Sequence, residues 1–120
     1  MRWRGLVALA ALVTMSCAGP ITVPVAVVSK GIPGGIMRGT NTFSLSEASF
    51  NVSNGTLSCG GSYNPLDTSL TVTTTVLCND GRKGIVISTR DRTGMSGGGT
   101  FTLNDGTTGS FIFGDAANKL

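Results

Sequence analysis

The sequence predicts an all-β fold, a small antiparallel meander barrel or sandwich that is built from hairpins. Short runs rich in valine, isoleucine, threonine and phenylalanine alternate with Asn-Gly and Asp-Gly dipeptides, which are typical of tight turns between strands. The 18 glycines are interleaved with these β-branched and aromatic residues, unlike those of a flexible low-complexity segment. A chain of 120 residues is long enough for one domain, so its strands should share a single core.

The first clear hairpin turns at Asn54-Gly55. A two-residue type I′ turn at this dipeptide would place Val52 opposite Leu57 and Phe50 opposite Cys59. Apolar residues would then pair with apolar residues across the two strands, so the register and the hydrophobic pattern agree.

Two further hairpins share a sequence pattern in which Asn-Asp-Gly is followed three residues later by glycine. The pattern occurs at 79–84 and recurs at 104–109 as a weak internal repeat. In the second copy, a three-residue loop with Gly106 in the left-handed conformation would pair Phe101 with Phe111.

The chain begins with the features of an export signal. Arg2 and Arg4 give a positive start, and an apolar stretch from Gly5 to Met15 follows. This stretch has the length of a signal-peptide core and is too short to span a bilayer. We therefore expect residues 1–16 to be a signal peptide and the mature chain to begin at Cys17.

Met15-Ser16-Cys17 resembles the lipobox of bacterial lipoproteins, although Thr14 stands where that family prefers leucine. The resemblance implies acylation of Cys17, and Ala18 after it implies sorting to the outer membrane, facing the periplasm. Two alternatives remain open: an ordinary cut after Ala18, which would give a periplasmic or secreted soluble protein, and an uncleaved anchor.

Together with the two remaining cysteines and the Asp-Gly hairpins, this start resembles small envelope lipoproteins of Gram-negative bacteria. In addition, Gly97-x-Gly99 followed by Asp105-Gly106 resembles one unit of a MORN-type hairpin repeat. Residues 17–35 are expected to form the lipidated N-terminus and a tether or edge strand, because Pro24 suits only an edge. The β domain is expected to cover 36–120.

Cys59 and Cys78 are the cysteines left after Cys17. In an oxidising envelope they are expected to form a disulfide, with two free buried thiols as the alternative. Because the two positions do not face each other across a tight turn, we expect the bridge to join non-neighbouring positions of a curved sheet.

The residues needed for common catalytic sites are missing, so no catalytic residue, metal or cofactor is predicted. The chain has no histidine, which excludes Ser-His-Asp and Cys-His catalysis and leaves a two-cysteine zinc site short of ligands. Glu47 is the one glutamate, and Asp80 and Asp105 are interpreted as turn residues rather than as calcium ligands or catalytic acids. The Gly97–Gly99 run lacks the lysine and the helix of a phosphate-binding loop.

The formal net charge of +3 includes Arg2 and Arg4, so the mature chain is almost neutral and nucleic-acid binding is not expected. Four basic residues surround one hairpin, and they are either charges that protect a solvated strand edge or a contact site for an envelope polyanion. They are Arg82, Lys83, Arg90 and Arg92.

These observations predict a non-catalytic envelope lipoprotein with a structural or interaction role. Its expected partners are the membrane, through the lipid anchor, and an envelope protein or polyanion. The alternative function is inhibition of a hydrolase such as lysozyme, by analogy with small disulfide-bonded lipoproteins of similar size.

Overall fold

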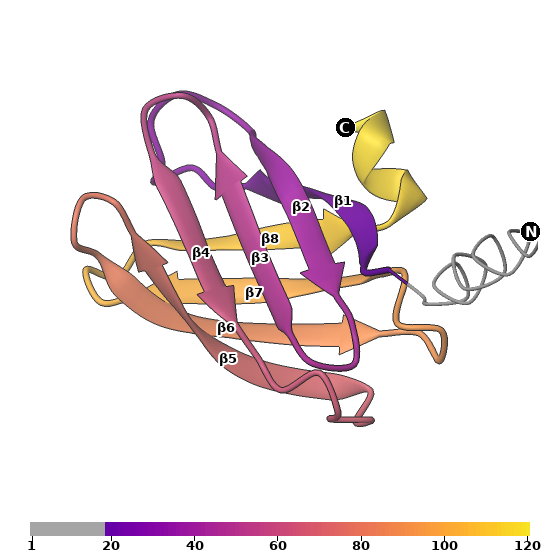
Figure 1. The fold of residues 1–120 in the computed structure, drawn as a ribbon. Helices are drawn as coiled ribbons and strands as arrows, with labels where there is room; N and C mark the ends of the chain where they lie inside the picture. The colour runs from indigo at the N-terminus through magenta and orange to yellow at the C-terminus, as the bar shows by residue number, and fades with distance from the viewer. Residues whose placement is uncertain (1–18) are drawn as a thin grey trace, which may run out of the picture.

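The computed structural model describes residues 19–120, so the predicted signal peptide and Cys17 lie outside the described residues. The described chain forms eight antiparallel strands and one short terminal 3-10 helix (Figure 1). The elements are β1 (Ile21–Val28), β2 (Met37–Phe43), β3 (Ala48–Ser53), β4 (Ser58–Ser62), β5 (Thr71–Cys78), β6 (Lys83–Arg90), β7 (Gly97–Leu103), β8 (Thr108–Phe113) and η1 (Asp115–Lys119).

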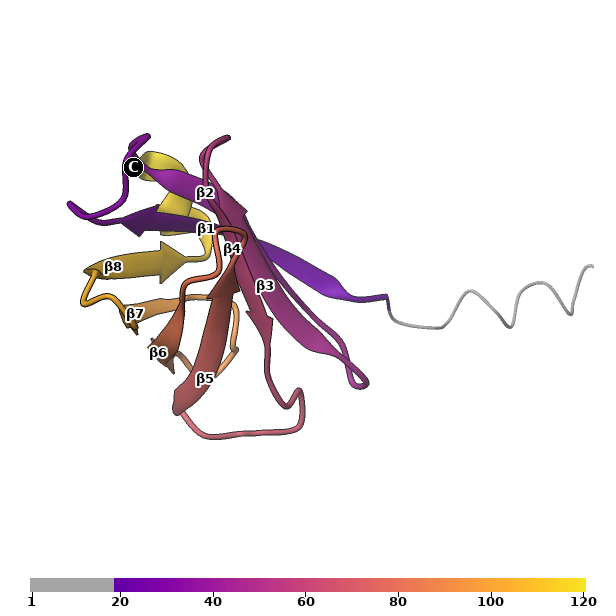
Figure 2. The same cartoon turned by 90° about the vertical axis from the view of Figure 1, so that its left-hand side faces the viewer.

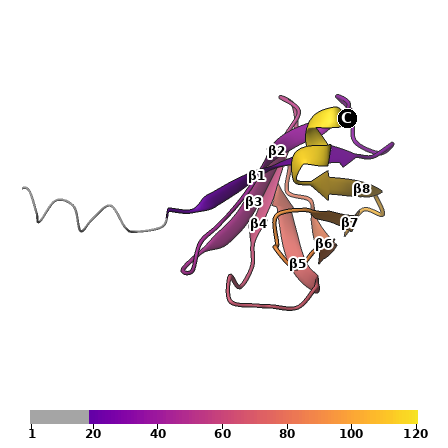
Figure 3. The same cartoon turned by 90° about the vertical axis from the view of Figure 1, so that its right-hand side faces the viewer.

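The strands form a closed meander barrel. Each strand pairs with the next one in the sequence, and β8 pairs with β1 to close the sheet. Figure 2 shows the strands curling around a common interior, and Figure 3 shows η1 beside β1 and β8. The all-β prediction is confirmed, and of the two architectures expected, the barrel is the one observed.

The barrel begins at Ile21, earlier than the expected boundary at residue 36. β1 pairs with β2 along its length and with β8 from Val25 onward. Pro24 lies just before the first β8 pair, where a missing N–H removes no ladder hydrogen bond. The first half of β1 is thus paired with β2 alone, whereas the second half is paired on both sides.

The interior is filled by phenylalanine rings that lie opposite glycines. Inside so small a barrel, two large side chains facing each other would collide, so large and small residues alternate. A Cβ atom added to any of these glycines would lie 2.5–3.0 Å from the opposite ring. The pairs are Phe50 with Gly61, Phe101 with Gly109, Phe111 with Gly99 and Phe113 with Gly97.

Both predicted hairpin registers are wrong by two residues. At the first turn, Ser53 pairs with Ser58 and four residues form the loop, so Val52 faces Cys59. The Asn54 side chain accepts a hydrogen bond from the backbone N–H of Leu57 at 3.0 Å, and Leu57 is buried at the end of the barrel. The longer loop is therefore stabilised by an apolar contact and a side-chain hydrogen bond, which the type I′ turn would lack.

At the last hairpin, the loop has three residues and Gly106 has a positive φ of 91°, as predicted. The loop is closed by Leu103, whose N–H donates to the Thr107 carbonyl at 2.8 Å. Phe101 consequently faces Gly109 rather than Phe111. A shift of two residues keeps every side chain on its face, and the space available to the rings selects between the registers.

Candidate functional site

The two ends of the barrel differ in chemistry. The end where β1 starts, here called the base, carries the connections 44–47, 63–70 and 91–96. The opposite end, called the tip, carries 29–36 and the three hairpin turns that contain Asn-Gly or Asp-Gly. In Figure 1 the base lies toward the lower right.

The internal repeat builds two equivalent turns at the tip. Asp80 accepts a hydrogen bond from the N–H of Arg82 at 3.0 Å, and Asp105 accepts one from the N–H of Thr107 at 2.9 Å. The glycine after each aspartate has a positive φ. The geometry of both aspartates is that of turn residues, which hydrogen-bond to their own backbone two residues on.

The first residue of each copy attaches its turn to the neighbouring strand. The Asn79 N–H donates to the Ser58 carbonyl at 2.8 Å, and the Asn79 side-chain oxygen accepts from the Ser58 N–H at 3.1 Å. Asn104 makes the same pair of bonds with Lys83, at 2.7 and 3.3 Å. The repeated asparagine thus links each hairpin to the strand before it.

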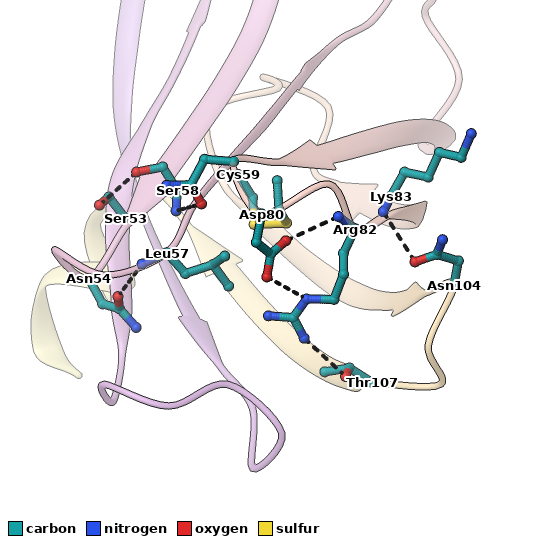
Figure 4. Close-up of a disulfide and its surroundings, with 12 residues drawn as sticks. Ser53, Asn54, Leu57, Ser58, Cys59, Asp80, Arg82, Lys83, Asn104 and Thr107 are labelled. Atoms are coloured by element: carbon teal, nitrogen blue, oxygen red, sulfur yellow. Dashed lines mark hydrogen bonds and ion pairs between the residues drawn. A yellow bond between two sulfur atoms is a disulfide. The ribbon is translucent and has the colours of Figure 1, made fainter.

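Arg82 joins the two turns to each other. Its Nε lies 2.8 Å from Asp80, and its Nη1 lies close to the Thr107 hydroxyl (Figure 4). The same Nη1 lies 3.1 Å from Asp105. The hydrogen bonds that the Arg82 guanidinium donates to these carboxylates raise the pKa of Arg82. The backbone N–H of Arg82, which donates to Asp80, is the main cause of the lowered pKa of Asp80. The guanidinium is therefore already ion-paired with carboxylates of the barrel itself.

The structure does not gather the four basic residues into one patch. Lys83 and Arg90 are the two ends of β6, which places them about 23 Å apart. Arg90 donates to the backbone carbonyls of Ser69, at 2.9 Å, and Asp67. β6 ends at Arg90, so Arg92 belongs to the next connection and does not share a strand face with it.

The disulfide joins Cys59 and Cys78, as predicted, but it joins neighbouring strands (Figure 4). The two cysteines are direct partners of β4 and β5, which corrects the expected link between non-neighbouring positions. The connection 63–70 joins these strands. Because it is too long to be a tight turn, the sequence does not indicate which residues of the two strands face each other. Two positions pair across β4 and β5, the fewest between any neighbouring strands in the described barrel. The covalent bond reinforces this short ladder.

The cavities within the barrel are too small for an organic ligand. One, lined by apolar residues that include Phe50 and Val86, has a volume of about 70 Å³, and another, which the same two residues border, has about 60 Å³. Sites for small molecules usually measure roughly 300–1,000 Å³. The interior is therefore a packed core.

A larger hollow of about 410 Å³ lies at the base, beside Pro20. Its walls carry serine and threonine hydroxyls, the Glu47 carboxylate and Tyr63. The Tyr63 hydroxyl donates to Asn41 at 2.9 Å, and the Ser44 hydroxyl accepts from the backbone N–H of Glu47 at 3.2 Å. The Tyr63 and Ser44 hydroxyls are thus engaged in hydrogen bonds within the barrel. Glu47 has no second carboxylate beside it in the walls of the hollow.

Five large apolar side chains are exposed at the base, and we call them the apolar rim. Each of the three connections at this end contributes at least one of them, and the start of β1 contributes another. They are Ile21 (40% exposed), Leu45 (86%), Leu66 (67%), Leu70 (50%) and Met95 (45%).

Side-chain hydrogen bonds shape the connections that present the apolar rim. The Asn64 side chain accepts from the N–H of Leu66 at 2.9 Å, and the Ser44 hydroxyl accepts from the N–H of Ser46 at 3.2 Å. In these turns the polar side chains bend back to the backbone, which leaves the apolar residues at the surface.

Asp91 holds the connection that carries Met95. Its carboxylate accepts from the hydroxyl of Thr93 at 2.6 Å and from the hydroxyl of Ser96 at 2.7 Å. These two bonds, followed by backbone N–H groups of the same turn, lower the pKa of Asp91 to about 2. The charged carboxylate thus stabilises the conformation that exposes Met95.

The apolar rim was not predicted from the sequence, although two of its members had a local signal. Leu45 lies between Ser44 and Ser46, and Leu66 follows the Asn64-Pro65 turn, where polar residues are the rule. Single exposed leucines are common on protein surfaces and do not by themselves indicate a binding site. Only the closed barrel shows that these residues occupy one end.

Comparison of the chain with protein-family models, with curated proteins and with solved structures finds no match. Within residues 19–120, no helix is both long enough and apolar enough to cross a membrane. The same part of the chain contains no group of three or more His, Cys, Asp or Glu residues arranged to hold a metal ion.

Proposed function

We propose that the protein is a non-catalytic bacterial envelope lipoprotein, anchored through acylated Cys17, whose barrel has a structural or interaction role. The observation that supports this most is the position of Met15-Ser16-Cys17 at the end of an apolar stretch and four residues before the first strand. A cut before Cys17 would leave the barrel sequence whole, joined directly to the acylated residue.

The Cys59–Cys78 disulfide supports export. Disulfides persist in oxidising compartments such as the bacterial periplasm and are rare in the cytosol. The bond lies in the shortest strand pairing of the barrel, so the fold gains from a compartment in which it stays oxidised.

The packed interior and the few available side chains support a non-catalytic role. The chain has no histidine, and the Tyr63 hydroxyl at the base hollow is bound to Asn41. Asp80 and Asp105 are both used in turns and in ion pairs with Arg82. A structural or interaction role needs only the surface that the barrel presents.

Membrane fractionation of the wild type and of Cys17→Ala tests the anchor. The wild type should remain with the outer membrane after a salt wash, whereas Cys17→Ala should be released into the soluble fraction or stall as an uncleaved precursor. The Cys59→Ser/Cys78→Ser variant is the matched control, since it keeps Cys17 and should still be retained. Equal retention of the wild type and Cys17→Ala would contradict the proposal.

A further inference from the structure

The position of Cys17 restricts how the barrel can lie relative to a membrane. β1 starts at Ile21, and four residues of extended chain span at most about 14 Å. If Cys17 is acylated, as the proposed function requires, its sulfur lies near the boundary between headgroups and acyl chains. The start of β1 is then held within about two headgroup layers of the hydrocarbon.

Two of the three connections of the base adjoin the point where the chain enters β1, and the third lies beside Pro24, further along this strand. Pro20 lines the same hollow as Ser46 and Pro65, from the first and second connections. Gly114 donates its N–H to the Pro24 carbonyl at 2.9 Å, and a Cβ added to Gly114 would lie 2.8 Å from the Met95 carbonyl. The short link to Cys17 thus brings the whole base, and the apolar rim with it, to the membrane.

The chemistry of the two ends favours the same orientation. The apolar rim exposes Leu45 and Leu66 by more than 60%, and burial of such surface in the interfacial region is favourable. At the tip, the repeated turns expose asparagine and aspartate side chains, and Arg82 is paired with carboxylates there. Val28 (47% exposed) and Ile36 (41%) are also exposed at the tip, but no large apolar side chain in the connections of the tip is as exposed as Leu45 or Leu66. The connections of the base are therefore the more apolar, and they suit an interface between water and lipid better.

We propose that the apolar rim contacts the lipid surface beside the Cys17 anchor, so that the barrel stands on its base with the tip pointing away from the membrane. The acyl chains supply the permanent attachment, and the apolar rim fixes the orientation. This inference rests on the proposed function, because an unacylated chain would not be held at the surface.

A single tryptophan can report which end meets the lipid. The chain has one tryptophan, Trp3, which lies in the predicted signal peptide, so the mature protein would have none. Leu66→Trp places a reporter in the apolar rim, and Leu77→Trp places one on the outer wall of β5 near the tip, where Leu77 is 61% exposed. Leu45→Trp is a second rim reporter in case Leu66→Trp fails to fold.

The acylated variants, purified from membranes, are reconstituted into liposomes of phosphatidylethanolamine and phosphatidylglycerol with brominated acyl chains. The rim reporters should be quenched at least threefold more strongly than Leu77→Trp and should emit at shorter wavelength. Liposome-bound protein with equal quenching at both ends, or with unquenched rim reporters, would overturn the orientation while leaving the anchor intact. Protein that does not float with liposomes would contradict the anchor, and the orientation with it.

Discussion

Reduction of the Cys59–Cys78 disulfide should lower the stability of the barrel by about 3 kcal/mol. The cysteines are 19 residues apart, and closing a loop of this length restricts the unfolded chain by that amount in the chain-entropy model. For a domain of this size, 1 kcal/mol corresponds to roughly 4–8 °C in melting temperature, so the melting temperature should fall by about 10–25 °C. The ladder between β4 and β5 has two paired positions. Apart from the ladder and the disulfide, the two strands are linked by the hydrogen bonds between Asn79 and Ser58 and by the bond from the Thr74 hydroxyl to the Ser62 carbonyl.

Thermal melts of the mature protein, followed by circular dichroism with and without a phosphine reductant, measure this change. The Cys59→Ser/Cys78→Ser variant should melt near the reduced wild type and should not respond to the reductant, which controls for other effects of the reagent. Hydrogen exchange should accelerate first in β4 and β5 after reduction. A reduced protein that melts within about 3 °C of the oxidised form, with unchanged exchange in these strands, would refute the reasoning.

Three other perturbations test the packing, the base and the tip. Gly109→Ala places a Cβ 2.5 Å from the Phe101 ring and should destabilise the barrel by about 1–3 kcal/mol in denaturant titrations, whereas Gly19→Ala, which meets no atom within 4 Å, should be neutral. The pKa of Asp91 is lowered from 3.8 to about 2, so the folded barrel should lose stability as the pH drops from about 4 to 2 and this carboxylate is protonated. Asp91→Asn should reduce the fall in melting temperature across that pH range. An equal fall in the wild type and in Asp91→Asn would contradict this role of Asp91. Gly106→Val should cost about 1–3 kcal/mol, because φ is positive there, and a neutral result would reject the turn.

The turn sequences identified the hairpins, but they did not determine their registers. Asn-Asp-Gly at 79–81 and 104–106 marks two turns that the structure contains, and Gly106 has the predicted conformation. Strand patterns have a period of two, so a shift of two residues preserves every inward-facing position. The registers are decided by contacts distant in the sequence, above all by the space for Phe101 and the other rings inside the closed barrel.

In the candidate sites too, features that depend on local sequence were predicted, whereas features that depend on contacts between distant residues were not. The number of cysteines and the expected oxidising compartment were enough to predict that Cys59 pairs with Cys78. The length of the connection 63–70 prevented the prediction that they face each other on neighbouring strands. The charge pattern around Arg82 suggested a basic patch, whereas its partner Asp105 lies 23 positions further along the chain and neutralises it. The apolar rim combines three connections and the start of β1, so it exists only once the barrel closes.

The most direct test of the proposed anchor is the intact mass of the native protein after extraction from membranes. We predict a chain that begins at Cys17 and carries the added mass of its acyl groups, with Cys59 and Cys78 still linked. A chain that begins at Gly19 without acyl groups, recovered from the soluble fraction, would contradict both the lipid anchor and the orientation of the barrel that depends on it.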